Sequence, residues 1–172
     1  RPDLGNDLSA LRREAIRVLL QRAGEDPNLA EPAFEVFFEA RQKVIFFDDA
    51  IPALDFLKSK YPMVALSNGN ADVHKVGLGN YFVAAFNPIN LGVSKPDSKM
   101  FHAGAQALGV LPEEVLHIGD DPHLDVLAAQ RAGMQSVWIN REEKQWAHDT
   151  HPAPFTVKCL KSLCDAWPVA SK

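Results

Sequence analysis

The sequence is poor in cysteine and has no long hydrophobic run. Its 172 residues contain only two cysteines, Cys159 and Cys164, whose spacing matches neither a redox CxxC pair nor a disulfide framework. A reducing, cytoplasmic location is therefore the expectation. No apolar run approaches the roughly 18 residues of a membrane-spanning helix, and no signal peptide is recognisable near the start. We therefore expect no membrane partner.

Excess positive charge is also lacking. The 18 Lys and Arg residues are outnumbered by 22 Asp and Glu residues, so the formal net charge is −4. Such a balance provides no broad basic surface, and no nucleic-acid partner is expected. With 47% hydrophobic and 23% charged residues, the composition is that of a soluble folded domain.

An initial methionine is missing too, because the sequence opens with Arg1. We interpret this start as indicating a fragment or a processed product. The length suits one domain, or one domain that carries a small appendage.

The spacing of apolar residues changes about a quarter of the way along the chain. The first forty-odd residues favour two helices, the second over Glu31–Gln42, with no strand between them. Beyond Val44, short apolar segments alternate with helical ones, which predicts a parallel sheet with helices on both faces. We therefore predict an α/β protein with a helical segment over residues 1–45 and an α/β core over residues 46–172.

The expected elements of the core are as follows. Strands are expected at Met63–Leu66, at Val115–Ile118, at Ser136–Ile139 and within Tyr81–Leu91 before Pro88. Helices are expected over Ala50–Lys60, capped by Asp49, and over Ala71–Val76, Asp97–Leu108 and Leu124–Ala132. The segment from Trp146 is expected to be irregular before a short helix around Leu160–Ala166.

A first polar cluster, Ser67-Asn68-Gly69-Asn70, directly follows an expected strand. Parallel α/β sheets place their binding sites in the loops that leave the carboxyl ends of strands. A hydroxyl and an amide beside a helix start can bind an anion through donors alone. The same residues are common in ordinary caps and turns, and taken alone that simpler interpretation is favoured.

A second cluster, Ser94-Lys95-Pro96-Asp97, immediately precedes the helix expected to follow it. The proline after Lys95 restricts the backbone, which favours a fixed positive charge at that point. The alternative is a solvated loop lysine, again the simpler interpretation in isolation.

The third cluster consists of Gly119-Asp120-Asp121 and the nearby Asp125. Adjacent carboxylates at the end of a buried strand repel each other, and a hard cation such as Mg²⁺ compensates that repulsion. In the alternative, Asp121 caps the next helix while Asp120 faces water. Because a cap needs one acid and this segment has three, we expect Asp120, Asp121 and Asp125 to hold Mg²⁺.

Together, the three clusters resemble the motifs of the haloacid dehalogenase (HAD)-like hydrolase superfamily, in particular its phosphatase branch with a helical cap. Ser67 stands in place of that family's second motif, Lys95-Pro96 of its third, and Gly119-Asp120-Asp121 with Asp125 of its fourth. The resemblance covers roughly residues 44–140. It implies a Rossmann-like core with residues 1–45 as part of an inserted cap.

The resemblance also implies a function, namely Mg²⁺-dependent hydrolysis of a small-molecule phosphate ester. Ser67, Asn68 and Gly69 would bind the phosphoryl group, and Lys95 would offset negative charge there. The segments Ser67–Ala71 and His117–Asp121 are similar to a bacterial subgroup that acts on flavin mononucleotide and phosphorylated riboflavin precursors. A sugar or nucleotide phosphate is the broader expectation.

The family's first motif, an apolar strand ending in Asp-x-Asp, is absent from the sequence. In the family, this motif supplies the nucleophile and the general acid/base. Phe46-Phe47-Asp48-Asp49 has adjacent acids and lies too close to Ser67, so we interpret it as the return from cap to core. We therefore expect the motif upstream of Arg1 and the chain alone to be inactive.

A structural expectation follows from the same absence. In the family the motif-one strand lies between the strands that end here at Leu66 and Ile118. Unpaired buried backbone groups cost roughly 1–3 kcal/mol each, so a strand from elsewhere is expected to fill that gap. It would come from the N-terminal part of the same polypeptide or from another copy.

Other functions remain open. The nearest is a 2-haloacid dehalogenase of the same superfamily, whose metal-free site typically lacks the Gly-Asp-Asp acids. A non-catalytic fragment or pseudoenzyme is allowed by the missing motif. A response-regulator receiver fits worse, because its acidic pair should precede its other motifs.

Overall fold

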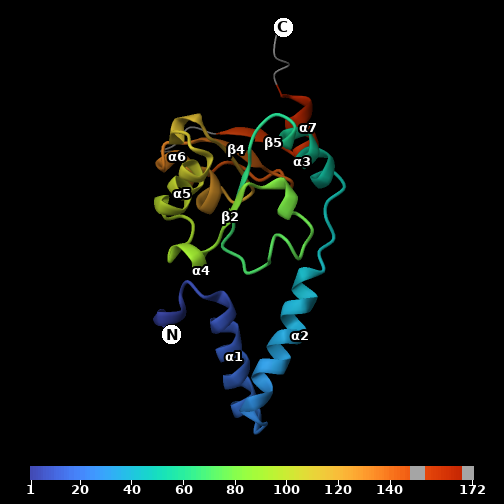
Figure 1. The fold of residues 1–172 in the computed structure, drawn as a ribbon, viewed down its shortest axis with the longest axis vertical. Coiled ribbons are helices and arrows are strands. Elements are labelled where there is room, and N and C mark those ends of the chain that lie inside the picture. The colour runs from blue at the N-terminus through green and yellow to red at the C-terminus, as the bar shows by residue number, and fades with distance from the viewer. Residues whose placement is uncertain (148–153, 168–172) are drawn as a thin grey trace.

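The computed structural model describes residues 1–147 and 154–167, drawn in colour in Figure 1. The helices are α1 (Leu8–Ala23), α2 (Ala30–Gln42), α3 (Ala50–Lys58), α4 (Pro88–Leu91), α5 (Ser98–Leu108), α6 (Ala128–Arg131) and α7 (Leu160–Asp165). The strands are β1 (Val64–Leu66), β2 (Ala84–Phe86), β3 (Leu116–Gly119), β4 (Gln135–Ile139) and β5 (Phe155–Val157). The expected α/β fold class is confirmed.

The five strands form two separate parallel sheets. β1 pairs with β2, with Val64 opposite Ala84, while β3, β4 and β5 form a three-stranded sheet in that order. Parallel neighbours require crossover connections, which the helices between the strands provide. In the described part of the chain, no ladder joins β1 to β3, although each ends in a polar cluster.

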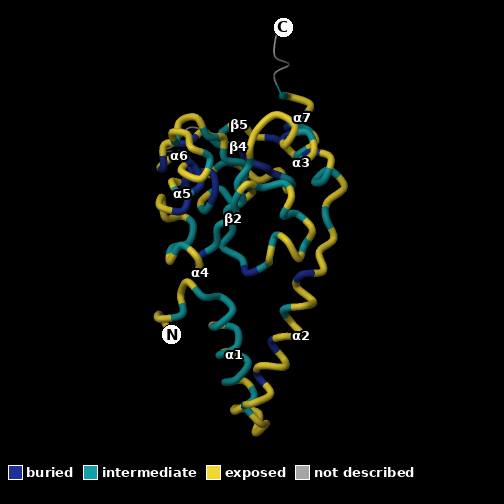
Figure 2. Tube along the Cα trace, in the orientation of Figure 1, coloured by how far each residue is buried: buried dark blue, intermediate teal, exposed yellow. Residues whose placement is uncertain are grey.

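The hydrophobic core lies around the three-stranded sheet and α5. Phe101 is fully buried against the alanines of α6, whose small side chains allow the two helices to pack closely. A second cluster brings Val137 and Ile139 of β4 against Val157 and Leu163. Figure 2 shows most of the buried residues in this part of the molecule, with a few more along α2.

Helices α1 and α2 pack against each other and extend away from the sheets (Figure 1). The Asp7 carboxylate accepts a hydrogen bond from the Ala10 N–H at 2.8 Å and begins α1, and Gly24 ends it with φ 76°. Phe34 of α2 is buried, with the Arg13 guanidinium 3.8 Å above its ring centroid. The two helices expected in the first forty-odd residues are therefore present.

Two local expectations were wrong. Residues 71–76 form turns instead of a helix, because the Asp72 carboxylate accepts hydrogen bonds from the His74 and Lys75 N–H groups and closes a turn. Strand β5 falls in the segment expected to be irregular. Its three residues are too few to give an alternating pattern, and pairing with β4 decides its conformation. Residues 148–153 of that segment lie outside the described residues.

The expectation that Asp49 caps α3 was also wrong. Asp49 precedes α3, but its side chain makes no hydrogen bond to that helix. Instead, Oδ2 accepts from the Leu160 N–H of α7 at 2.7 Å, and Oδ1 accepts from Nη2 of Arg141 at 2.8 Å. The carboxylate therefore caps a helix more than a hundred residues away along the chain.

No helix in residues 1–147 or 154–167 is long and apolar enough to cross a bilayer.

Candidate active site

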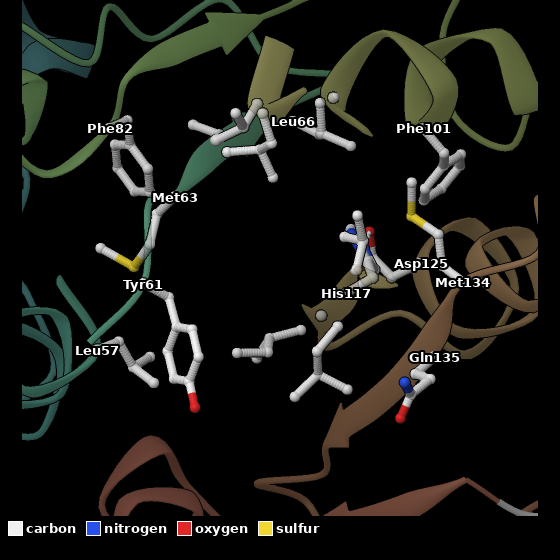
Figure 3. Close-up of a pocket in the computed structure, with 18 of the residues that line it drawn as sticks. Leu57, Tyr61, Met63, Leu66, Phe82, Phe101, His117, Asp125, Met134 and Gln135 are labelled. Atoms are coloured by element: carbon white, nitrogen blue, oxygen red, sulfur yellow. Dashed lines mark hydrogen bonds and ion pairs between the residues drawn. The ribbon is translucent and has the colours of Figure 1, made fainter. Parts of the chain in front are cut away.

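A cavity of about 800 Å³ lies between β1 and β3 (Figure 3). Apolar side chains line most of it, with Met63 and Leu66 on the β1 side and Met134 on the opposite side. Its ionisable lining residues include Lys95, His117, Asp120 and Asp125, which lie in β3 or in the polar clusters. The cavity thus lies beside three of the predicted site residues, Lys95, Asp120 and Asp125, whereas Ser67, Asn68, Gly69 and Asp121 are not part of its lining.

Lys95 is held in place by its backbone as well as by its ammonium group. Nδ2 of Asn68 donates to the Lys95 carbonyl at 2.8 Å, and Oδ1 of Asn68 accepts from the Lys95 N–H at 2.8 Å. Nζ of Lys95 donates to Oδ1 of Asp125 at 2.6 Å, and its side chain is only 13% exposed. The structure therefore places a fixed positive charge here, and Asn68 positions it.

Asp125 joins two basic side chains to the backbone of its own loop. Nε2 of His117 lies 3.3 Å from Oδ1, and Oδ2 accepts from the Asp121 N–H at 3.1 Å. Burial by itself raises the pKa of the Asp125 carboxyl, but the hydrogen bond from His117 and the ammonium of Lys95 hold that pKa well below its usual range. Asp125 therefore remains a carboxylate paired with Lys95.

The backbone next to Asp125 explains how the carboxylate comes so close to β3. Asp125 lies in a π-helical turn, Pro122–Leu127, that leads directly into α6. A Cβ atom on Gly119 would lie 2.3 Å from Cβ of Asp125, so no larger residue fits at that position without displacing the carboxylate. The glycine of the Gly-Asp-Asp segment is needed for this close approach.

The three acids expected to bind Mg²⁺ are not gathered into one cluster. Oδ1 of Asp121 accepts from the N–H groups of His123 and Leu124 at 2.8 and 2.7 Å, so Asp121 caps the π-helical turn. Asp120 is exposed, and its carboxylate makes no hydrogen bond or ion pair with the described residues. Within residues 1–147 and 154–167, no group of three or more His, Cys, Asp or Glu side chains could hold a metal ion. Of the three, only Asp120 keeps a free carboxylate.

Ser67 lies at the end of β1 with its hydroxyl proton available. Its N–H donates to the Phe86 carbonyl at 3.0 Å, which continues the pairing of β1 with β2. Oγ accepts from the Gly69 N–H at 3.0 Å. Because a hydroxyl that accepts one hydrogen bond can still donate its proton, Ser67 can bind an anionic oxygen.

Sequence reasoning left three residues near the site without a role. His117 was placed in a strand but not linked to Asp125; its position two residues before Gly119 puts both on one face of β3, and that alternation could have indicated the contact. Arg12 and Arg41 donate to Oδ1 of Asn70 at 3.3 and 2.9 Å. Their distance along the chain, 58 and 29 residues from Asn70, left no local pattern to indicate these contacts.

The chain matches the model of a known hydrolase family, described as haloacid dehalogenase-like hydrolase, over residues 3–133. The chain belongs to this family. The matched residues include Ser67, Lys95 and all three acids of the fourth motif. The family resemblance inferred from the motifs is therefore confirmed.

Among curated proteins, phosphatases of the HAD-like family are similar to the chain. The 5-amino-6-(5-phospho-D-ribitylamino)uracil phosphatase YigB of Escherichia coli is 35% identical over 145 residues, which cover 82% of this chain and 61% of YigB. The phosphoserine phosphatase of Thermus thermophilus is 31% identical over 136 residues, which cover 76% of this chain and 55% of that enzyme. The chain thus spans less than two thirds of either relative.

The fold is also similar to solved structures of HAD-like hydrolases. The 2-haloacid dehalogenase from Pseudomonas syringae pv. Tomato superposes with a TM-score of 0.86 at 34% identity, covering 95% of this chain and 73% of the dehalogenase. Phosphatases and a dehalogenase are therefore both among the relatives. The comparisons support a hydrolase of this family. They do not distinguish a phosphatase from a dehalogenase, so the chemistry of the site must be used for that choice.

Proposed function

We propose that the intact protein is an Mg²⁺-dependent phosphatase that hydrolyses a small-molecule phosphate monoester. The observation that carries this proposal is the fixed position of Lys95: Asn68 holds its backbone, and Asp125 pairs with its ammonium group. A phosphate dianion requires a positive charge and hydrogen-bond donors that are in place before it binds. Lys95 supplies the charge and the Ser67 hydroxyl a donor.

The chain's own residues then have distinct roles. Lys95 offsets negative charge on the phosphoryl group and on the attacking carboxylate, Ser67 donates to a phosphoryl oxygen, and Asn68 positions Lys95. Asp125, which the His117 ring contacts, holds the ammonium in its orientation. The attacking aspartate and the general acid/base of the family's chemistry are not in this sequence, so the 172 residues alone are expected to bind phosphate but not to turn it over.

Asp120 is the residue that fits a role in binding Mg²⁺. The ion keeps several waters and uses one or two carboxylates together with the oxygens of a phosphate, and the Asp120 carboxylate is free for that contact. Both Asp125 oxygens are already engaged, so Asp125 supports the loop, whereas Asp121 uses only Oδ1 for its cap and keeps Oδ2 for a second contact with the ion. When bound, Mg²⁺ supplies electrostatic stabilisation of charge on the phosphoryl oxygens.

Inorganic phosphate provides the test. We expect it to bind the purified chain and Lys95→Met to weaken that binding at least about tenfold, since a charge-assisted contact contributes about 1.5–3 kcal/mol. Lys99→Met is the matched control, because Lys99 is an exposed lysine of α5 close by in sequence. Equal affinity in both variants would contradict the proposal, and phosphatase turnover by the chain alone would refute its expected inactivity.

A dehalogenase is the second candidate, favoured by the 34% identity to a 2-haloacid dehalogenase. The free carboxylate of Asp120 argues for the phosphatase, because the dehalogenase reaction needs no metal. Titration with Mg²⁺ in the presence of phosphate separates the two. We expect Asp120→Asn to remove the Mg²⁺ enhancement of phosphate binding, whereas a dehalogenase site would show no enhancement to remove.

We also propose that the cavity between β1 and β3 receives a strand from outside the described chain, either from the N-terminal part of the same polypeptide or from another copy. The two facing edges belong to parallel strands, neither edge is paired with the other, and the space between them is mainly apolar. A parallel strand would join the two sheets into one six-stranded sheet, about the usual size of a sheet. In the same arrangement, α1 and α2 form part of a cap.

A further inference from the structure

Two arginines lie where α1 and α2 meet the loop after β1. Nε of Arg41 donates to Oδ1 of Asn70 at 2.9 Å, and Nη1 of Arg12 donates to the same oxygen at 3.3 Å. Nδ2 of Asn70 donates to Oγ of Ser9 at 3.1 Å. Asn70 is only 8% exposed, so one buried amide joins both helices to the core.

The positive charge of this pair is not balanced within the described chain. No carboxylate of residues 1–147 or 154–167 forms an ion pair with Arg12 or Arg41, although an arginine–carboxylate pair is found for other arginines: Arg1, Arg13, Arg17 and Arg141. Arg12 also lies 4.7 Å from the centroid of the Phe37 ring. A neutral amide oxygen does not offset two cations that face it together, and the two charges repel each other.

The Arg41 guanidinium lies close to the proposed phosphoryl site, with Gly69 next to both. A Cβ atom on Gly69 would lie 3.2 Å from Oγ of Ser67 and 3.4 Å from Nη2 of Arg41. Both atoms therefore border the same small space, which the glycine leaves open. A ligand bound to the Ser67 hydroxyl has a guanidinium within reach of its next group.

We propose that Arg12 and Arg41 form a binding subsite for a second anionic group, a carboxylate or a phosphate, on the part of the substrate that leaves the phosphoryl group. This inference rests on the proposed phosphatase function and narrows its substrates to phosphate esters with two anionic groups. Guanidinium groups bind such groups through paired N–H donors in a fixed plane. A substrate anion would balance the charge that Asn70 leaves uncompensated.

Two phosphate esters that differ in one charged group test the subsite. Phosphoglycolate carries a carboxylate and ethyl phosphate does not, and the affinity of each for the 172-residue chain is measured by NMR titration. We expect phosphoglycolate to bind at least about fivefold more tightly, since each charged hydrogen bond contributes appreciably even at a partly exposed site. Arg12→Gln and Arg41→Gln should each reduce this preference to within about twofold. Arg22→Gln, at the exposed end of α1, should leave it unchanged.

The ratio of the two affinities separates binding from a structural role. A variant that only loosens the junction between the helices and the core changes both affinities by the same factor, so an unchanged ratio in both arginine variants overturns the inference. Equal affinities in the unmodified chain overturn it too, and the proposed phosphoryl site is then retained if Lys95→Met still weakens binding at least about tenfold. A preference that persists while Lys95→Met has no effect overturns the proposed function and leaves an arginine anion site. If neither ester binds, both proposals fail.

Discussion

At the scale of single residues, the site depends on a carboxylate that supports a cation. Asp125 is 4% exposed, yet three donors contact its two oxygens: the Lys95 ammonium, the His117 ring and the Asp121 N–H. A buried ion pair adds little stability by itself, but loss of one partner leaves the other charge buried without compensation. The role of Asp125 is therefore to keep Lys95 in place.

Replacement of Asp125 should be costly. We expect Asp125→Asn to lower the free energy of unfolding by about 3–5 kcal/mol, because Lys95 would remain buried without its counter-charge. Urea denaturation followed by circular dichroism measures the change. Asp120→Asn, which removes an exposed and unpaired carboxylate, should change stability by less than about 0.5 kcal/mol. Equal effects of the two substitutions would contradict this account.

Asp49 provides a prediction for pH. Burial by itself raises the pKa of the Asp49 carboxyl, but the Arg141 guanidinium and the N–H groups of Lys161 and Leu160 hold that pKa below its usual value. A carboxyl with a lowered pKa in the folded state stabilises the protein above its unfolded-state pKa of about 3.9, and this contribution disappears as the pH falls further. The stability difference between the unmodified chain and Asp49→Asn should be about 1–3 kcal/mol at pH 7 and shrink below about pH 4.

Thermal or urea unfolding at a series of pH values measures this difference. Asp48→Asn serves as the control, because the neighbouring Asp48 is exposed and has no hydrogen-bond partner among the described residues. A difference that grows as the pH falls would contradict the assignment of Asp49 as the cap of α7.

At the scale of elements, the turn after β3 shows how one backbone segment builds the site. Gly119 ends the strand, Asp121 caps the π-helical turn, and that turn directs Asp125 back toward β3. π-helical turns are rare and are often found at functional sites. The loop is therefore shaped by its hydrogen bonds, which use two of the three acids.

A methyl group on Gly119 should disturb this turn. Because the added Cβ would lie 2.3 Å from Cβ of Asp125, we expect Gly119→Ala to displace the carboxylate, lower stability by about 2–4 kcal/mol and weaken phosphate binding. Denaturation and phosphate titration measure the two effects. Gly24→Ala is the comparison: open space surrounds Gly24, so only its positive φ matters, at a cost of about 1 kcal/mol. Unchanged phosphate binding in Gly119→Ala would argue against a role for this loop in the site.

At the scale of the whole molecule, the two sheets leave facing edges open. The Ser67 N–H donates to β2, and successive N–H groups alternate in direction, so those of Val64 and Leu66 point toward the cavity. Open edges of this kind pair readily with another strand. The arrangement explains why a mainly apolar cavity of about 800 Å³ lies in the middle of the fold.

Hydrogen exchange tests whether a strand fills the cavity. We expect the Val64 and Leu66 amides to exchange rapidly in the dilute chain, and to become protected when a strand pairs with β1. Sedimentation at increasing concentration separates the two sources, since a second copy gives a dimer and a segment of the same polypeptide does not. Slow exchange of both amides in the dilute monomer would contradict the proposal.

The sequence determined the elements that rest on local chemistry. Apolar periodicity located α5, β3 and β4, and the three polar clusters were found after strands or before a helix because caps, turns and strand ends have local residue preferences. The same clusters predicted the HAD-like family, which the comparisons confirm over residues 3–133. Local patterns suffice for these features because each depends on residues a few positions apart.

Only the tertiary structure decided how the charged groups are used. Asp49 caps α7 instead of α3, Asp125 pairs with Lys95 instead of joining a cluster of acids, and Arg41 meets Asn70 across the junction of helices and core. Carboxylates and guanidinium groups bind whichever partner folding brings within hydrogen-bond distance, and those partners are distant in sequence. The spacing of a motif predicts what kind of chemistry such residues can perform, whereas the packing of the chain determines which groups they contact.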